Sequence, residues 1–351
     1  MRQVVIPRHG PPDVLRMREL PDPEPGDGEV RIAVQASGVN FADVLARLGL
    51  YPDAPKPPVV VGYEVCGTVD RVGAGVVAPR LGDRVVALTR FGGYADQVVV
   101  PAAFAFPVPP AIDAASAAAI PVNYVTALIA LYRMANVAAG ETVLVHGAGG
   151  GVGIAATQLA KRRGATVIGT ASAAKHEAIR ALGVDHTIDY RTADVVAEVR
   201  RLTNGRGVDV VLDPIGGRSF ADSYRMLAPL GRLIAYGVSS IATGERRSLW
   251  RALTTMVAMP RFNPLSLMNR NRGVFGLNVG HLWSERDRLA EGMTLLLDEV
   301  GAGRLRPIVA RTFPLDRAAD AHRFMQSRSN IGKVVLITDG ARGSGLVEGL
   351  R

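Results

Sequence analysis

The stretch from Thr142 to Gly153, T-V-L-V-H-G-A-G-G-G-V-G, constrains the fold more than any other part of the chain. β-Favouring residues run into a glycine cluster, and residues 154–163 then have the composition of a helix. In this order, glycine lets backbone N–H groups approach a pyrophosphate, and the helix N-terminus adds partial positive charge. The stretch therefore predicts a dinucleotide site. A flexible loop without a ligand is the competing interpretation.

The residues around this stretch alternate between short apolar runs and helical segments. The predicted strands are 142–146, 166–170, 186–189, 208–213 and 232–236, and the helices that follow the first four are 154–163, 174–182, 194–202 and 220–227. Apolar runs separated by helices predict a parallel sheet covered on both faces. Such a doubly wound sheet binds its ligand at the carboxyl ends of the strands.

The rest of the chain has a different rhythm. Residues 1–110 alternate short β-like runs with Pro/Gly turns, and the tail from 304 returns to Pro-punctuated strands. The predicted strands are 30–34, 65–69, 84–88, 97–100, 274–279 and 333–338, and the predicted helices are 41–48, 114–120, 124–134, 285–300 and 317–326. With 351 residues, the chain is an α/β protein with a second, β-rich domain.

Cysteine and charge limit the classes of protein. A single cysteine, Cys66, excludes an internal disulfide framework and a thiolate cluster for zinc or iron–sulfur, and its apolar strand predicts a buried, inert thiol. The net charge of +9 could attract nucleic acid, acidic lipid or a phosphorylated ligand, but with only four lysines it also fits codon bias towards arginine. Early prolines break any secretory signal, which predicts a cytoplasmic protein.

The segment 239–272 interrupts the strand–helix rhythm and has two interpretations. It places apolar residues beside six arginines, with Glu245 as the only acid: Leu249, Trp250, Leu253, Met256, Val257, Met259, Arg246, Arg247, Arg251, Arg261, Arg270 and Arg272. Its apolar part is too short and too charged to cross a bilayer. It is either a helical cover over a core or pocket, or a basic amphipathic helix at a membrane surface.

The residues after the second strand indicate which dinucleotide is bound. A ribose 2′-hydroxyl is normally held by an acid about 20 residues beyond the glycine turn. That place holds Thr170-Ala171-Ser172, followed by Lys175 and His176, with no acid. Hydroxyl and cationic groups suit a 2′-phosphate, so the segment predicts NADPH. Alternatively, Lys175 lies on the surface at the start of a helix and binds no phosphate.

Several motifs together resemble the zinc-independent quinone oxidoreductases of the medium-chain dehydrogenase/reductase superfamily, closest to the synaptic vesicle membrane protein VAT-1 branch. They are G-V-N-F-A-D at 38–43, G-L-Y-P at 49–52, V-N-Y-V-T-A at 122–127, H-G-A-G-G-G-V-G at 146–153, A-S-A-A-K-H-E at 171–177, D-P-I-G-G at 213–217 and N-R-G-V-F-G-L-N-V-G at 271–280. The resemblance implies a GroES-like catalytic or substrate domain over 1–122 and 284–351. It also implies an NADPH-binding Rossmann domain over 123–283, with a basic insert at about 240–272, and a homodimer.

The resemblance also implies that no catalytic zinc is bound. Zinc alcohol dehydrogenases of this superfamily carry a Cys and a His where this chain has Asn40 and Tyr63. An amide and a phenol are poor zinc ligands at neutral pH, so no metal is predicted. Hydride transfer to an electrophilic quinone or enone needs less help from the protein than alcohol oxidation does.

The site residues implied by the resemblance fall into two groups. Asn40 and Thr126 would hold the nicotinamide ribose and carboxamide, and Phe275 and Leu277 would lie against the nicotinamide. The glycine-turn residues would lie at the pyrophosphate: Gly147, Gly150, Gly151, Val152 and Gly153. Ser172, Lys175 and Tyr190 would surround the 2′-phosphate, and Gly237 is a further cofactor-binding candidate. Phe275 and Leu277 could equally be core or dimer-edge residues.

The catalytic candidates are Tyr51, Asn40 and Asp43. Tyr51 is the candidate proton donor or substrate-orienting hydroxyl, although a turn tyrosine beside Pro52 is as often structural. Asn40 could simply cap the helix that begins at Phe41, and Asp43 could serve only in an ion pair.

The leading hypothesis is a zinc-independent, NADPH-dependent reductase of quinones or α,β-unsaturated carbonyls. One alternative is an NADPH-binding protein whose main role is interaction with a membrane surface or RNA through residues 245–272. Of these two, nucleic acid is the less favoured partner, because the chain has no long basic block. Another alternative is a carrier-linked enoyl reductase.

Overall fold

The computed structural model describes residues 1–339, which form two compact units. The first unit comprises Met1–Val125, Gly244–Arg247 and the described residues from Gly280 onward, and the second comprises Thr126–Thr243 and Ser248–Val279. The functional division predicted at 122/123 and 283/284 stays a prediction.

The first unit is built on a mainly antiparallel sheet. Along the sheet the strands are β14 (Val309–Pro314), β15 (Lys333–Ile337), β3 (Glu29–Val39), β4 (Glu64–Val72), β5 (Arg84–Leu88) and β7 (Ala105–Pro107), with β6 (Gln97–Pro101) paired to β3. The strands β1 (Arg2–Val5) and β2 (Arg16–Glu19) form a separate antiparallel pair. Alternate residues such as Val30, Ile32 and Val34 are buried, because successive side chains of a strand point to opposite faces.

The helices of the first unit are α1 (Phe41–Arg47), α2 (Ala114–Ala118), α10 (Arg286–Gly301) and α11 (Ala318–Gln326). Short 3₁₀ turns lie at Pro12–Val14, Ala102–Phe104 and Leu315–Arg317, and Val279–His281 forms another where the chain re-enters this unit. Cys66 is buried in β4, and burial raises the pKa of its thiol to about 11. The prediction that Cys66 is buried is confirmed, and its inertness stays a prediction.

The second unit contains a six-stranded, fully parallel sheet. Its order is β10 (His186–Asp189), β9 (Thr166–Ala171), β8 (Thr142–His146), β11 (Val208–Asp213), β12 (Leu227–Ala235) and β13 (Gly273–Gly276). Numbered within this unit, the order is 3-2-1-4-5-6, which is that of a dinucleotide-binding sheet. Because the strand order reverses between β8 and β11, the glycine turn after β8 lies at the topological switch point.

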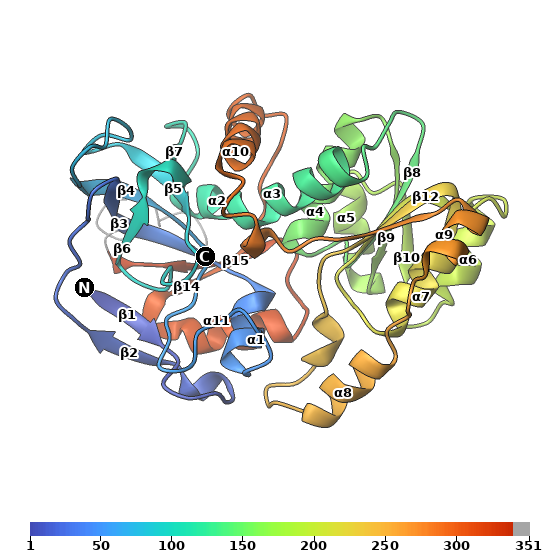
Figure 1. Ribbon diagram of the computed structural model, residues 1–351, viewed down its shortest axis with the longest axis horizontal. Coiled ribbons are helices and arrows are strands. Elements are labelled where there is room, and N and C mark those ends of the chain that lie inside the picture. The colour runs from blue at the N-terminus through green and yellow to red at the C-terminus, as the bar shows by residue number, and fades with distance from the viewer. Residues whose placement is uncertain (340–351) are drawn as a thin grey trace. The chain divides into compact units, whose positions relative to one another are not determined.

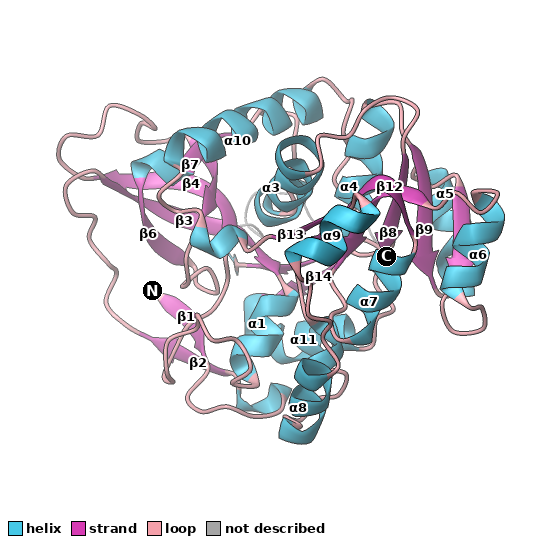
Figure 2. Ribbon diagram, turned by 45° about the vertical axis from the view of Figure 1, so that its right-hand side comes forward, coloured by secondary structure: helices cyan, strands magenta, loops and turns pink. Residues whose placement is uncertain are grey.

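Helices flank this sheet (Figures 1 and 2). They are α4 (Gly151–Arg162), α5 (His176–Ala181), α6 (Val195–Leu202) and α7 (Arg218–Arg225). α4 contacts β8 and β9, and α7 contacts β11 and β12. The predicted doubly wound α/β fold is confirmed. The predicted helix 124–134 is instead α3 (Pro121–Leu128) followed by a π-helix over Ile129–Met134, and the predicted strand 274–279 ends at Gly276.

The insert forms a 3₁₀ turn at Ser239–Ile241 and the helices α8 (Leu249–Val257) and α9 (Pro264–Arg270). No residue of either helix is buried, and the side chains of Trp250 and Val257 are 75% and 77% exposed. A helix that covers a core would bury its apolar side chains, so the interpretation as a cover over a core is wrong for α8 and α9. Cover over a pocket stays a prediction. No helix among residues 1–339 has both the length and the apolar content needed to cross a bilayer.

Candidate active site

The glycine turn of the second unit has the geometry that a pyrophosphate site needs. Gly147 follows β8 with a φ of +66°, which side chains disfavour, and Gly150 is the N-cap of α4. A Cβ on Gly153 would lie 2.4 Å from the carbonyl oxygen of Gly147 and 2.8 Å from the Cα of Ala148. Glycine at 153 therefore lets α4 pack directly on the turn. Val152 lies in the first turn of α4, which has no acidic residue.

The ends of β9 and β10 bring together the residues predicted to surround a 2′-phosphate. Asp189 of β10 pairs with Ala171 of β9, so Ser172 and Tyr190 follow at the same edge of the sheet. Ser172 is buried, whereas Tyr190 is exposed.

Lys175, in a 3₁₀ turn over Ala173–Lys175, lies against the glycine turn. A Cβ built on Gly149 would be 3.2 Å from its Cδ and 3.8 Å from its Nζ. The ammonium is thus near the pyrophosphate turn and does not simply extend into solvent from the helix start.

Arg191 is a cation at this edge that the sequence analysis missed. Its guanidinium carbon lies 6.0 Å from the centroid of the Tyr190 ring. The adjacent Tyr-Arg pair after a predicted strand was the available signal. Two cations, Lys175 and Arg191, therefore follow β9 and β10 at the carboxyl end of the sheet.

The other predicted cofactor residues of the second unit are dispersed along it. Gly237 follows β12, and Thr126 is buried on α3. Phe275 lies on the edge strand β13 and is 38% exposed, whereas Leu277 is 7% exposed. Their predicted roles at the nicotinamide stay predictions.

In the first unit, Asn40 belongs to a buried polar network. Its Oδ1 accepts a hydrogen bond of 2.6 Å from Lys333 Nζ, and its Nδ2 donates to Glu64 Oε1 at 2.9 Å. Lys333 and Glu64 form an ion pair with side chains only 2% and 0% exposed. Glu64 Oε2 accepts from the backbone N–H of Val122 at the start of α3. The Asn40 side chain is therefore fixed by this pair, and the interpretation that it merely caps α1 is incomplete.

Asp43 forms a second buried cluster with partners from three parts of the first unit. Its carboxylate accepts from the N–H groups of Asn40 and Gly62 at 2.7 and 2.9 Å and from the hydroxyl of Tyr94 at 3.1 Å. The Tyr94 hydroxyl also lies 3.1 Å from Nε2 of His322. Burial raises the pKa of Asp43 to about 7, against the opposing effect of its hydrogen bonds. The described ion pairs do not include Asp43, so the ion-pair interpretation has no support.

Tyr51 is half-buried, and its ring lies edge-on to that of Tyr63 with the centroids 6.1 Å apart. The structure therefore places Tyr51 beside Tyr63, which stands where zinc alcohol dehydrogenases of this superfamily carry a zinc-binding histidine. Its predicted role as a proton donor stays a prediction.

The residues do not fit a catalytic zinc. The Asn40 amide oxygen and the Glu64 carboxylate, which could bind a cation, are both bound to the Lys333 ammonium. Tyr63 is the remaining candidate, and burial raises the pKa of its phenol well above the ordinary value, so it stays protonated. Among residues 1–339, no cluster of three or more His, Cys, Asp and Glu side chains could hold a metal ion.

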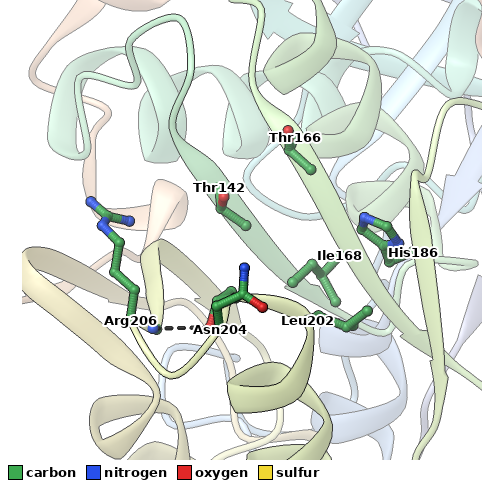
Figure 3. Close-up of a pocket in the computed structure, with 9 residues that line it drawn as sticks. Thr142, Thr166, Ile168, His186, Leu202, Asn204 and Arg206 are labelled. Carbon is green, nitrogen blue, oxygen red and sulfur yellow. Dashed lines mark hydrogen bonds between the residues drawn. The ribbon is translucent and has the colours of Figure 1, made fainter.

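A hollow of about 150 Å³ lies at the opposite edge of the parallel sheet, where strands begin (Figure 3). Thr142, Thr166 and His186 line it from the starts of β8, β9 and β10. Typical small-molecule sites are about 300–1,000 Å³ and lie at the carboxyl ends of such strands. This hollow is therefore separate from the predicted dinucleotide site.

Comparisons with known proteins identify the class. The family model described as "Alcohol dehydrogenase GroES-like domain" matches residues 26–110, and that described as "Zinc-binding dehydrogenase" matches residues 182–336. Together with the parallel sheet and the glycine turn, they place the chain in the medium-chain dehydrogenase/reductase superfamily.

Within the superfamily, the chain belongs with the homologues of the synaptic vesicle membrane protein VAT-1. It is 41% identical to the Danio rerio VAT-1 homolog over 340 residues, which is 96% of this chain and 70% of the relative. It is 37% identical to a 2-haloacrylate reductase of Burkholderia sp. over 342 residues, covering 95% and 98% of the two chains. The Escherichia coli quinone oxidoreductase complexed with NADPH has a TM-score of 0.84 at 30% identity, covering 96% and 100%.

Proposed function

We propose that this protein is a zinc-independent, NADPH-dependent oxidoreductase that transfers hydride to a quinone or an α,β-unsaturated carbonyl. The observation that carries the proposal is the buried Asn40–Glu64–Lys333 network. In this network the Lys333 ammonium binds the side-chain oxygens that a catalytic metal ion would need. The relatives named quinone oxidoreductase and 2-haloacrylate reductase support the same class of reaction.

Bound NADPH would supply a hydride at its nicotinamide. The glycine turn would bind the pyrophosphate through the N-terminus of α4, and Ser172, Lys175, Tyr190 and Arg191 would bind the 2′-phosphate. The substrate would gain two electrons and one proton as hydride and a second proton from solvent, giving a hydroquinone or a saturated carbonyl. Asn40, held by Glu64 and Lys333, would orient the reacting groups without changing its own charge.

Discrimination between NADPH and NADH tests the cofactor assignment. Replacing Lys175 with Ala should raise the Kd for NADPH about 10- to 100-fold, because a charge-assisted hydrogen bond contributes about 1.5–3 kcal/mol. The Kd for NADH should rise less, because NADH shares the pyrophosphate near Lys175 and lacks the 2′-phosphate. Cofactor fluorescence titration measures both constants. Lys161→Ala is the matched control, since Lys161 pairs with Asp185 in the same unit. Equal affinity of the wild type for NADPH and NADH would contradict the assignment.

The substrate class is tested by NADPH oxidation across quinones, small enones and carrier-linked enoyl thioesters. Turnover of quinones or free enones supports the proposal. Turnover of carrier-linked substrates alone would show a carrier-linked enoyl reductase, and turnover of none would contradict a reductase of this class.

A second candidate function is docking on an anionic membrane surface through α8. Leu249, Leu253 and Met256 recur at helical spacing, and each is more than half exposed. Arg251 is exposed on the same helix, and Arg246 and Arg247 are exposed just before it in the chain. An exposed apolar stripe flanked by cations is typical of helices that lie in a lipid interface.

Sedimentation with phosphatidylserine vesicles at physiological salt tests this second function. Binding should weaken at high salt and in the Arg246/Arg247/Arg251→Gln variant, while phosphatidylcholine vesicles should bind less. Leu295→Ser is the control for a single exposed apolar side chain outside the insert. Unchanged vesicle binding in the triple variant would contradict membrane docking, and binding of RNA instead of vesicles would favour the nucleic-acid alternative.

A further inference from the structure

Three aromatic rings meet in the first unit. The centroid of the Tyr63 ring lies 6.1 Å from that of Tyr51, with an interplanar angle of 83°, and 5.3 Å from that of Phe91, at 56°. All three residues are half-buried, so each ring is only partly covered. Such edge-to-face and tilted contacts are favourable, and they leave ring surface for a further planar group.

The Tyr63 hydroxyl differs from the rings around it. It is buried, and no hydrogen-bond partner for it exists among residues 1–339. Leaving a buried hydroxyl unpaired is costly, and native proteins rarely do so. By contrast, the buried hydroxyl of Tyr94 contacts both Asp43 and His322. The unpaired Tyr63 hydroxyl therefore indicates a partner that is not part of this unit's own side chains.

The backbone on both sides of Tyr63 is held firmly. The N–H of Gly62 donates to Asp43, and the carbonyl of Tyr63 accepts from the N–H of Thr89 at 2.9 Å. The next residue, Glu64, is locked to Lys333 and Asn40. The hydroxyl is thus attached to a rigid segment next to the catalytic candidates, which is the arrangement that preorganised donors need.

We infer that the Tyr63 hydroxyl donates a hydrogen bond to the carbonyl oxygen of the substrate, and that the rings of Tyr51, Tyr63 and Phe91 form the wall against which a planar quinone ring lies. This inference rests on the proposed reductase function and deepens it. Hydride transfer places negative charge on that oxygen, and a neutral donor in a water-poor site stabilises the charge. Because the phenol stays protonated, it remains a donor throughout the neutral pH range.

The inference assigns to Tyr63 the orienting role for which Tyr51 was the candidate in the sequence. It also favours quinones over aliphatic enones, since aromatic faces add stacking energy only for a planar ring. A residue that replaces a zinc-binding histidine would thereby take over part of the metal's task, polarising the carbonyl without a charge of its own.

The test is Tyr63→Phe, which removes the hydroxyl and keeps the ring. The melting temperature should stay level or rise, because an unpaired hydroxyl is lost. The kcat/KM for quinones should fall about 100- to 1,000-fold, as expected for loss of one donor to a developing oxyanion. Quinone affinity for the protein saturated with NADP⁺, measured by calorimetry, should fall as well, which gives a readout independent of turnover.

Tyr132→Phe is the matched control, because the Tyr132 hydroxyl donates to the carbonyl of Leu159 in the second unit. This control should lower the melting temperature and leave quinone kinetics unchanged, the reverse of the Tyr63→Phe pattern. If the wild type reduces quinones and Tyr63→Phe has the same kcat/KM, the role of Tyr63 is overturned and the proposed function still stands. A loss confined to Tyr51→Phe would also overturn the role of Tyr63. A wild type that binds NADPH and reduces no substrate would overturn the proposed function, and the inference with it.

Discussion

Asn40, Glu64 and Lys333 form a unit whose members depend on one another. The two hydrogen bonds of the Asn40 amide fix which end carries the oxygen, since lysine can only donate and carboxylate can only accept. A buried ion pair is weak support for stability as a whole, but removing one partner leaves an uncompensated buried charge.

Replacing Lys333 with Met should therefore lower the free energy of unfolding by about 3–5 kcal/mol, because Glu64 loses its counter-charge. The double variant Lys333→Met/Glu64→Gln should recover part of that loss. Lys56→Met, at an exposed lysine, is the control and should change stability by less than about 0.5 kcal/mol. Urea unfolding measures all three. If Lys333→Met lowers the free energy of unfolding no more than Lys56→Met does, the buried ion pair between Lys333 and Glu64 is contradicted.

Asp43 predicts a pH dependence with a definite sign. Burial raises its pKa from 3.8 to about 7 in the folded protein, so between these values the folded state binds the proton that the unfolded state has released. The contribution of Asp43 to the free energy of unfolding should thus fall as pH rises from about 4 to about 7 and stay level above.

The comparison of wild type with Asp43→Asn isolates this effect. Their difference in unfolding free energy should change by up to about 1.4 kcal/mol per pH unit between about pH 4 and pH 7. The wild type should become less stable relative to Asp43→Asn as pH rises. Urea unfolding at pH 5, 6, 7 and 8 measures it. A constant difference would contradict the raised pKa and show that the donors from Asn40, Gly62 and Tyr94 keep the carboxylate ionised in the folded state.

At the scale of elements, the strand–turn–helix from β8 to α4 was predictable because its signals are local. A run of β-favouring residues, a glycine cluster and a helical sequence follow one another without a break. The polar network was not predictable in this way. Asn40 lies 24 residues from Glu64 and 293 from Lys333, and only the pairing of β15 with β3 brings Lys333 beside it.

The insert shows a similar limit. Its composition predicted helices, and α8 and α9 are present. Composition does not decide which face of a helix is covered, because that depends on packing partners from elsewhere. The outward apolar stripe of α8 could therefore be recognised only in the structure.

Gly153→Ala tests the contact between α4 and the turn. The added methyl would meet backbone atoms of Gly147 and Ala148, so the helix must shift away from the turn. The variant should lose about 1–3 kcal/mol of stability and most of its NADPH affinity. The control Gly244→Ala has open space around its Cβ and should bind NADPH normally. Calorimetric unfolding and NADPH titration distinguish them, and unchanged NADPH binding in Gly153→Ala would contradict the assigned pyrophosphate site.

At the scale of the whole molecule, the sequence predicted a β-rich part and a doubly wound part, because the period of the apolar pattern changes between them. The exact limits depend on tertiary contacts, and residues 244–247 of the insert pack with the first unit. The predicted homodimer stays a proposal. β13 is an edge strand that could pair with a second copy, and light scattering that gives a monomer at micromolar concentration would contradict it.

Hydride transfer from NADPH without zinc can be tested on the purified protein. Purified protein is treated with a chelator, its zinc content is determined, and NADPH oxidation is followed with a quinone as acceptor. Full turnover is expected with zinc far below one ion per chain, and a much lower rate is expected with NADH. Turnover that disappears with the metal and returns only when zinc is added would contradict hydride transfer without zinc.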